Sequence, residues 1–374
     1  MTMQRFVFSG DGHLREPKDL WADALPASMR QFGIHTRRTD SHIMTYAGEK
    51  LVHRFPLRRE TTTDENDPAN NGRPNIKGAT DLDARIADME FEGIDAEIVF
   101  PTTGMLNYLI EDEDTEYAST QVYNDWNDGF FAGHLERFVR CGLLPVRNFA
   151  HTVAEMERLA KKGFTAAMLP SNIPEGVPFY NSEAWDPVFD AAQRLGIVLT
   201  LHTATGRPDL RPESGPGGAI INYTDQMRDA IHSIMYMVAG GTLDRFPGAK
   251  VMVVESGASW LAGLAERMDE VAEGHDIFVQ PKLSMKPSEI IKRQVYASFQ
   301  YDRACIMSRS VTGHTGLVWG SDYPHHEGTF PNSRDVVARL FDGIDISEEE
   351  KADIVGLNGA RLFRLPHPAL AQAA

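Results

Sequence analysis

Short apolar runs recur along the chain, and glycine, proline or polar residues bound each of them. Most runs are followed by a segment in which apolar side chains repeat with helical spacing. Two runs, IVLTL at 197–201 and VMVV at 251–254, are continuously apolar, as is typical of parallel strands buried on both faces. The pattern predicts eight β-strands, at 6–10, 96–100, 138–146, 165–169, 197–201, 251–254, 295–299 and 316–319.

Segments with one apolar stripe separate several of these strands. An alternation of strands and amphipathic helices is typical of βα units, and eight such strands predict a closed α/β barrel of the TIM type. The stripes that support the helices are Leu82, Ile86 and Met89, then Val153, Met156 and Leu159, and then Trp260, Leu264 and Met268.

A long polar stretch at about 18–77, rich in Arg, Asp, Thr, Asn and Pro, exceeds a simple βα connection. We interpret it as an insertion after the first strand, placed over the mouth of the barrel, within a single domain that spans residues 1–374. Substrate specificity is expected in this insertion and in the loops near 102–110, 171–180 and 204–222.

Composition excludes several classes of partner. A formal net charge of -16 disfavours nucleic acid and anionic membrane surfaces, because both attract clustered Lys and Arg. The two cysteines, Cys141 and Cys305, form no CxxC pair, which argues against a disulfide framework or a thiolate metal site. The first residues lack the pattern of a signal peptide, and a cytoplasmic location is expected.

Residues that bind metals follow four of the predicted strands. In a parallel barrel the carboxyl ends of the strands meet at one face. Taken singly, a histidine at a strand end is more often structural, and Gly-Ser-Asp is compatible with a capping turn. Together, converging carboxylates are costly without a cation, which favours a divalent metal. The residues at these ends are Asp11 and His13, His202, Glu255, and Asp322 with His325.

Several motifs make the chain resemble the decarboxylase-like branch of the amidohydrolase superfamily, typified by aminocarboxymuconate semialdehyde decarboxylase. They are GDGHLREPKDLW at 10–21, YNDW at 123–126, LHT at 201–203, RFPGAKVMVVESGASW at 245–260, WGSDYPHHEG at 319–328, and LNGARLFRL near the end. The resemblance implies a distorted (β/α)8 barrel with one divalent ion, usually zinc or manganese. It implies four metal ligands, Asp11, His13, His202 and Asp322.

Two positions depart from the family pattern. Asp11 stands where many members have His or Glu, which favours metals that prefer oxygen ligands. Glu255 stands where many members have a catalytic histidine. Ionised Asp11 and Asp322 balance one divalent ion, so an ionised Glu255 leaves an excess charge. Protonation, an arginine partner, a second cation and a purely structural ion pair remain open for Glu255.

The resemblance implies metal-dependent, cofactor-free decarboxylation of a small carboxylated aromatic or unsaturated acid. Asp322 or Glu255 then supplies the proton, His325 contacts substrate or orients Asp322, and Arg15 binds a substrate carboxylate. The same residues suit hydrolysis of an ester, lactone, amide or C–C bond by metal-activated water. A non-catalytic binding barrel is a third interpretation. A homo-oligomer is expected by analogy only.

Overall fold

Parallel strands form the centre of the structure, a computed structural model that describes residues 6–56, 76–210 and 212–366. All eight predicted strands are present, with the first split in two, so the predicted α/β barrel is confirmed. Neighbours follow the order β1-β6-β7-β8-β9-β10-β11-β12, and β2 also pairs with β6. The strands are β1 (Phe8–Ser9), β2 (His13–Leu14), β6 (Ala96–Pro101), β7 (Phe138–Leu143), β8 (Ala166–Pro170), β9 (Val198–His202), β10 (Val251–Val254), β11 (Val295–Phe299) and β12 (Leu317–Trp319).

Backbone hydrogen bonds bring the two ends of this sheet together. The N–H of Gly10 donates to the carbonyl of Trp319 at 2.8 Å, and the N–H of His13 donates to the carbonyl of Tyr323 at 2.6 Å. A Cβ at Gly320 would lie only 2.9 Å from both N and Cβ of Asp11. The near-closure of the barrel therefore depends on close backbone approach at this seam.

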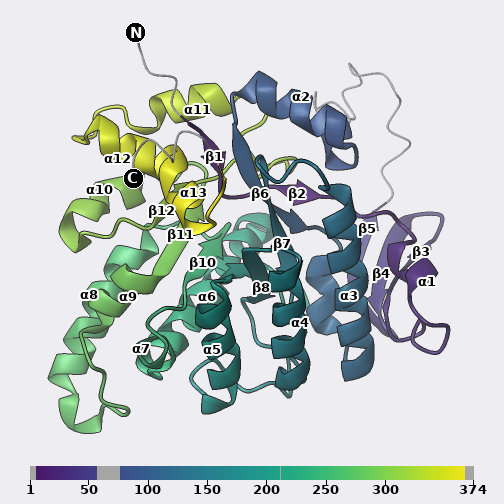
Figure 1. Cartoon of the computed structure of the whole chain (residues 1–374), viewed down its shortest axis with the longest axis horizontal. Helices are drawn as coiled ribbons and strands as arrows, with labels where there is room; N and C mark the ends of the chain where they lie inside the picture. The colour runs from purple at the N-terminus through teal and green to yellow at the C-terminus, as the bar shows by residue number, and fades with distance from the viewer. Residues whose placement is uncertain (1–5, 57–75, 211, 367–374) are drawn as a thin grey trace.

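Helices cover the outside of the barrel, and α3, α4 and α5 lie side by side in the foreground of Figure 1. The three predicted stripes fall in α2, α4 and α8, which confirms them. The barrel helices are α2 (Leu82–Glu92), α3 (Glu113–Phe130), α4 (Phe149–Lys161), α5 (Asp186–Leu195), α6 (Gly218–Ala239), α7 (Thr242–Arg245), α8 (Trp260–Gly274), α9 (Pro287–Gln294), α10 (Arg303–Thr312), α11 (Ser333–Leu340), α12 (Glu348–Ala352) and α13 (Asn358–Leu362). Shorter turns are η2 (Lys77–Ala79), η3 (Gly104–Leu109), η4 (Glu183–Trp185), η5 (Asp276–Phe278) and the π-helical η6 (Asp353–Leu357).

Polar caps and glycines set the helix ends. In α2 the Asp81 carboxylate accepts the N–H of Ala84 at 2.8 Å, and the helix ends at Gly93, whose φ of 72° is left-handed. In α4 Asn148 accepts the N–H of Ala150 at 3.0 Å. The helix ends set by these local signals agree with the tertiary packing. The helices therefore connect parallel strands whose carboxyl ends lie at the same face of the barrel.

The predicted insertion contains a small sheet of its own. Helix α1 (Leu20–Ala24) precedes three antiparallel strands, β3 (Ile34–Arg38), β4 (His42–Ala47) and β5 (Lys50–Pro56). The indole N–H of Trp21 donates to the carbonyl of Ser119 at 3.1 Å, which ties α1 to α3. Residues 57–75 of the predicted insertion lie outside the described residues.

An open cleft of about 600 Å³ lies between this insertion and the loops after β6, β7, β8 and β9. It brings together residues of the three loops in which specificity was expected and the first residue of β5. The lining residues are Lys50, Tyr108, Leu109, Glu111, Arg147, Asn172, Ile173, Pro174, Glu175, Gly206 and Pro208.

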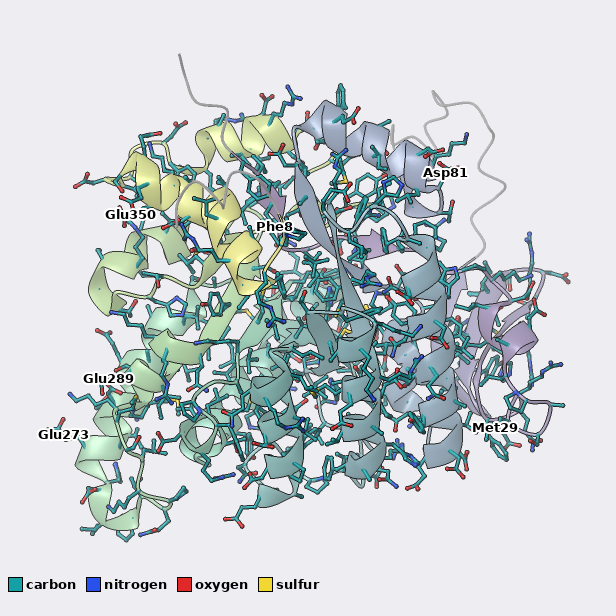
Figure 2. The ribbon with its side chains drawn as sticks, viewed as in Figure 1. Phe8, Met29, Asp81, Glu273, Glu289 and Glu350 are labelled. Carbon is teal, nitrogen blue, oxygen red and sulfur yellow. The ribbon has the colours of Figure 1, made fainter. Side chains whose placement is uncertain are left out.

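Apolar side chains fill the barrel and the layer beneath the helices. Figure 2 shows Phe8, which is fully buried, in the interior, whereas the exposed Glu273 and Glu350 lie at the periphery. Within residues 6–56, 76–210 and 212–366, no helix combines the length and the apolar composition needed to cross a bilayer.

Candidate metal centre

The first strand is interrupted where it carries its two predicted ligands. In β1 Phe8 pairs with Ala96, but in β2 His13 pairs with Phe100, so the chain gains one residue against β6. This irregularity is a bulge, which re-aims side chains at a barrel rim. Asp11 and His13 therefore converge because of the bulge, and not because a regular strand places alternate residues on one side.

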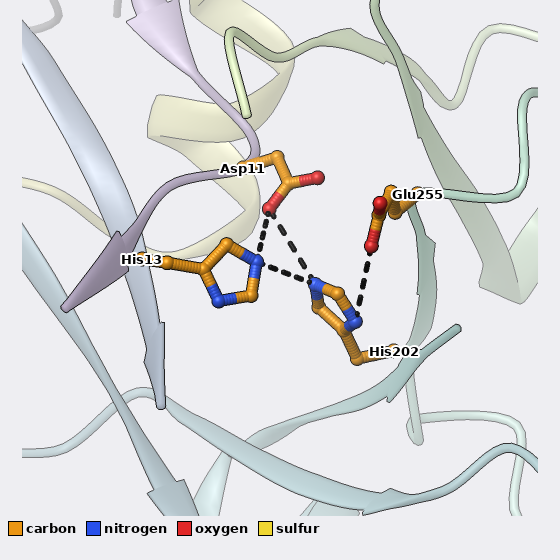
Figure 3. Close-up of side chains that lie close together, drawn as sticks. All are labelled: Asp11, His13, His202 and Glu255. Atoms are coloured by element: carbon orange, nitrogen blue, oxygen red, sulfur yellow. Dashed lines mark hydrogen bonds and ion pairs between the residues drawn. The ribbon is translucent and has the colours of Figure 1, made fainter. Parts of the chain in front are cut away.

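His13 and His202 face each other with their Nε2 atoms 3.0 Å apart (Figure 3). The Nδ1 of His13 lies 2.9 Å from the carbonyl of Pro101, and that of His202 lies 3.0 Å from the carbonyl of Thr203. Because a carbonyl oxygen only accepts, Nδ1 carries the proton in both rings. The Nε2 lone pairs then point at each other, so a proton or a metal ion must lie between them.

Two buried carboxylates adjoin these imidazoles. Oδ1 of Asp11 lies 3.5 Å from Nε2 of His13 and 3.6 Å from Nε2 of His202. Oδ1 of Asp322 lies 3.7 Å from Nε2 of His13. Both oxygens of Asp11 and Oδ2 of Asp322 are buried without a hydrogen-bond partner among the described residues.

These donors fit a divalent cation. The possible ligand atoms of Asp11, His13, His202 and Glu255 lie within 4.8 Å of one another, as do those of His13, Asp322 and His325. The two Nε2 atoms and the unpartnered carboxylate oxygens offer lone pairs where a cation offsets the cost of burial. The structure thus brings all four predicted ligands together, and it adds Glu255 beside them.

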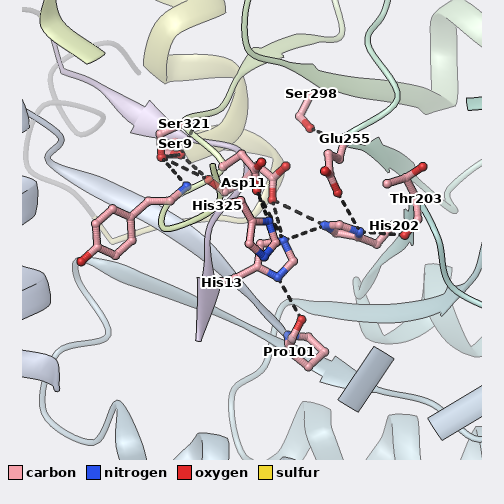
Figure 4. Close-up of polar contacts among 12 residues, drawn as sticks. Ser9, Asp11, His13, Pro101, His202, Thr203, Glu255, Ser298, Ser321 and His325 are labelled. Carbon is pink, nitrogen blue, oxygen red and sulfur yellow. Dashed lines mark hydrogen bonds and ion pairs between the residues drawn. The ribbon is translucent and has the colours of Figure 1, made fainter. Parts of the chain in front are cut away.

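Glu255 and Asp322 share an unusual backbone conformation. Their φ angles are 57° and 55°, in the left-handed region that residues with a side chain rarely adopt. Each lies just beyond the end of its strand, β10 or β12. Figures 3 and 4 show the carboxyl group of Glu255 turned toward His202, and the carboxylate of Asp322 lies within ligand distance of His13 and His325. Strained backbone of this kind concentrates at functional sites.

The more accessible side of the cluster carries Glu255, His325 and Glu327. The side chain of Glu255 is 15% exposed and that of His325 is 31% exposed, whereas the four predicted ligands are at most 1% exposed. Nδ1 of His325 lies 2.8 Å from Oδ1 of Asp322 (Figure 4). Oε2 of Glu255 lies 3.6 Å from Nδ1 of His202. His325 therefore contacts Asp322, and its expected role toward substrate or Asp322 stays a prediction.

Burial and the charges of neighbouring residues shift the pKa values of several side chains in this cluster. Burial and the neighbouring His325 lower the pKa of His13 to about 3. Burial, together with the charge of Asp322, raises the pKa of Glu255 well above its usual value. Burial also raises the pKa of Asp322, and the charge of Asp11 adds to the effect. Such opposed shifts are typical of sites that bind cations or transfer protons.

The loop after β2 has two different parts. Arg15 is exposed, and its backbone N–H donates to the carbonyl of Ala79 at 2.8 Å. Glu16 is buried, and its carboxylate accepts the backbone N–H groups of Thr102, Thr103 and Gly104 at 2.9 to 3.1 Å. Glu16 therefore caps η3, and the assignment of Arg15 to the substrate carboxylate stays a prediction.

Sequence reasoning missed a buried ion pair behind the cluster, between Arg85 and Glu97. The sequence does contain a signal for each of these two residues. Arg85 lies between Leu82 and Met89 on the apolar face of α2, and Glu97 interrupts an otherwise apolar strand. A charged residue on each of two buried faces indicates an internal partner. Glu327 was also missed, and no periodic pattern singles it out.

Comparison with known proteins decides the family. The sequence profile described as Amidohydrolase matches residues 77–365, a segment that includes His202, Glu255, Asp322 and His325. The chain belongs to the amidohydrolase family. Asp11 and His13 precede the matched segment, so their place in the site rests on the geometry given above.

Individual relatives of this amidohydrolase are distant in sequence. It is 22% identical to a 2-amino-3-carboxymuconate-6-semialdehyde decarboxylase from Dictyostelium discoideum over 295 residues, which cover 76% of this chain and 77% of the relative. An amidohydrolase structure from Mycobacterium avium subsp. paratuberculosis has a TM-score of 0.80 at 20% identity, covering 97% of this chain and 100% of that one.

A third relative carries a metal. The structure of a dihydroxybenzoic acid decarboxylase from Polaromonas sp. JS666, with bound manganese and the inhibitor 2-nitroresorcinol, has a TM-score of 0.66 at 16% identity. The match covers 98% of each chain. The predicted resemblance to the decarboxylase-like branch and the predicted barrel are confirmed.

Proposed function

We propose that this amidohydrolase is a metal-dependent decarboxylase of a small carboxylated aromatic or unsaturated acid. The observation that carries the proposal is the buried donor cluster, in which two imidazole Nε2 atoms lie 3.0 Å apart beside carboxylate oxygens that lack a hydrogen-bond partner among the described residues. The decarboxylase names of the Dictyostelium relative and the Polaromonas structure supply the reaction class.

Asp11, His13, His202 and Asp322 would hold one divalent ion, manganese or zinc. Two ionised carboxylates neutralise its charge, and the Nδ1 contacts to backbone carbonyls fix both imidazoles with Nε2 available. A bound ion supplies a Lewis acid that anchors and polarises the substrate's carboxylate and an adjacent oxygen. Manganese in the Polaromonas structure supports this choice of metal.

Glu255 is the proposed proton donor. It is more exposed than the ligands, and it is not needed to neutralise a divalent ion that Asp11 and Asp322 already balance. In decarboxylation the C–CO2 bond breaks and a C–H bond forms, so a protonated Glu255 gives its proton to the carbon that loses carbon dioxide and recovers one from solvent. Burial, with the charge of Asp322, raises the pKa of Glu255 above its usual value, which favours the protonated form.

His325 and Asp322 act together in this proposal. The Nδ1–H of His325 donates to Oδ1 of Asp322 at 2.8 Å, which holds the carboxylate in place and leaves Nε2 of His325 for the substrate. The exposed Arg15 would meet the substrate's carboxylate at the approach to the site. In this proposal the rest of the substrate would approach through the cleft lined by Lys50, Tyr108 and Arg147, which the loops after β6 to β9 border.

A carbon dioxide assay tests the proposal. The manganese-loaded enzyme is incubated with hydroxybenzoates, carboxylated vanillates and unsaturated amino-carboxylic acids, and carbon dioxide release is measured with Glu255→Gln as the site variant. The exposed Glu113→Gln serves as the matched control. We expect release with at least one acid, loss of release in Glu255→Gln and full release in Glu113→Gln.

Two results would replace the proposal. Turnover of esters, lactones or amides by the same protein without carbon dioxide would establish hydrolysis. Binding of these acids without turnover in either assay would establish the non-catalytic barrel.

A further inference from the structure

A fully buried arginine lies directly behind the metal centre. Arg85, on α2, forms an ion pair through Nε with the carboxylate of Glu97 on β6, and both side chains are at most 1% exposed. Its Nη1 donates to the carbonyl of His13 at 2.6 Å. Its guanidinium carbon lies 4.9 Å from the ring centroid of Tyr323, the residue after Asp322.

The first strand approaches this guanidinium closely at Gly12. A Cβ at Gly12 would lie 2.8 Å from Oε2 of Glu97 and 2.9 Å from Nη2 of Arg85. Gly12 separates the predicted ligands Asp11 and His13. The absence of a side chain at Gly12 therefore lets the first strand approach the ion pair closely.

Tyr323 is held from its other side as well. Its hydroxyl donates to Oδ2 of Asp88 at 2.5 Å, and a Cβ at Gly78 would lie 2.2 Å from that hydroxyl oxygen. Arg85 and Asp88 lie one turn apart on the same helix. Helix α2 thus holds the ring that follows the ligand Asp322.

These contacts join two strands that carry different ligands. Asp11 and His13 belong to the first strand, Asp322 follows the last, and the two strands meet at the seam of the barrel through Gly12 and Tyr323. The bond to the carbonyl of His13 is charge-assisted, and the planar guanidinium can donate and stack at once. A shift of this group would change the separation of His13 and Asp322.

We propose that Arg85, oriented by Glu97, is a positioning residue that sets the spacing of the metal ligands across the barrel seam and so determines metal affinity. This inference rests on the proposed function in one respect, namely that the cluster binds a divalent ion. Arg85 itself touches neither metal nor substrate.

The chain offers a matched control in Arg140 on β7. Arg140 is also buried, its Nη1 pairs with the carboxylate of Asp128, and its Nη2 donates to the carbonyl of Lys162 at 3.0 Å. Its guanidinium carbon lies 4.2 Å from the ring centroid of Phe164. Arg140 therefore has the same kinds of contact as Arg85, but none of these partners belongs to the metal centre.

The experiment measures Mn2+ affinity, from the electron paramagnetic resonance signal of free Mn2+, in the wild type, Arg85→Met and Arg140→Met. We expect Arg85→Met to bind Mn2+ about 10–100-fold more weakly, as for other groups that orient ligands. Arg140→Met should bind within twofold of the wild type. Activity of Arg85→Met should return at high Mn2+, which a loss of folded protein would not allow.

Each outcome decides the proposal. Equal affinity in the wild type and Arg85→Met, or equal weakening in both arginine variants, would overturn it while leaving the proposed function intact. Failure of the wild type to bind Mn2+ would overturn the proposed metal centre together with it. If Arg85→Met does not fold, two further variants are measured: Arg85→Lys and the double variant Arg85→Met/Glu97→Gln. The double variant leaves no buried unpaired carboxylate. Both must bind Mn2+ more weakly than the wild type by the same factor.

Discussion

Glu116 on α3 provides a quantitative test of how burial changes the pKa of a carboxyl group, and with it the pH dependence of stability, in this barrel. Its side chain is fully buried, and its carboxylate accepts the backbone N–H groups of Val146 and Arg147 at 3.0 to 3.2 Å. These two residues lie in the loop after β7, at the carboxyl end of that strand. Burial raises the pKa of Glu116 from 4.5 to about 7, because the hydrogen bonds offset only part of the lost hydration.

The sign of the effect follows from proton linkage. A carboxyl group whose folded pKa is raised binds its proton more tightly in the folded state. Its contribution to stability is complete below pH 4.5 and is lost as the pH rises to about 7. The difference between 4.5 and about 7 corresponds to about 3 kcal/mol. For 374 residues that free energy corresponds to about 4 °C in melting temperature.

The perturbation is Glu116→Gln, which keeps an acceptor for both N–H groups but does not ionise. Thermal or urea unfolding of both proteins is followed at several pH values from 4.5 to 8, and the stability of the wild type is subtracted from that of the variant. We expect this difference to rise by about 3 kcal/mol in favour of the variant between pH 4.5 and 7. A difference that stays constant, or that falls with pH, would refute the reasoning.

Three other predictions concern the metal centre. Saturation with Mn2+ at about 1000 times its Kd should stabilise the wild type by about 4 kcal/mol, or about 5 °C, in a thermal melt. The Asp11→Asn variant should lose this increase in melting temperature. The Glu113→Gln variant, which changes the more exposed group of Glu113, Asp114 and His151, should keep it, and the reverse pattern would place the ion at that group. Gly12→Ala should lower stability by about 1–3 kcal/mol, measured by urea unfolding, because its Cβ meets Glu97 and Arg85; an unchanged midpoint would contradict this packing. Asp322→Asn should abolish carbon dioxide release even in excess Mn2+, and substantial remaining release would remove Asp322 from the site.

The barrel was predictable because each signal was local. Continuously apolar runs predicted strands such as β10, and apolar stripes predicted helices such as α2. The sheet of β3, β4 and β5 was not predicted, since its strands mix polar and apolar residues without one buried face. Its position depends on contacts of β3 with α1 and of β4 with η3, which no local pattern contains.

The metal centre was predictable from position and residue type, but its geometry was not. Strand ends identified Asp11, His13, His202, Glu255 and Asp322 as candidates, and the family resemblance implied that all but Glu255 are ligands. The structure gathers these residues. The bulge between β1 and β2 depends on pairing with β6, about 88 residues away, and so has no local signal. The left-handed backbone of Glu255 and Asp322 likewise depends on how the barrel closes around them.

In the proposed function, Asp11, His13, His202 and Asp322 hold a catalytic divalent ion. Elemental analysis tests it most directly, on protein loaded with Mn2+ or Zn2+ and then passed through metal-free buffer, for the wild type, His202→Ala, Asp322→Ala and the control Glu113→Gln. We predict about one ion per chain in the wild type and the control, and strongly reduced metal in the two ligand variants. A wild type that retains no metal, or ligand variants that retain as much as the wild type, would contradict the claim.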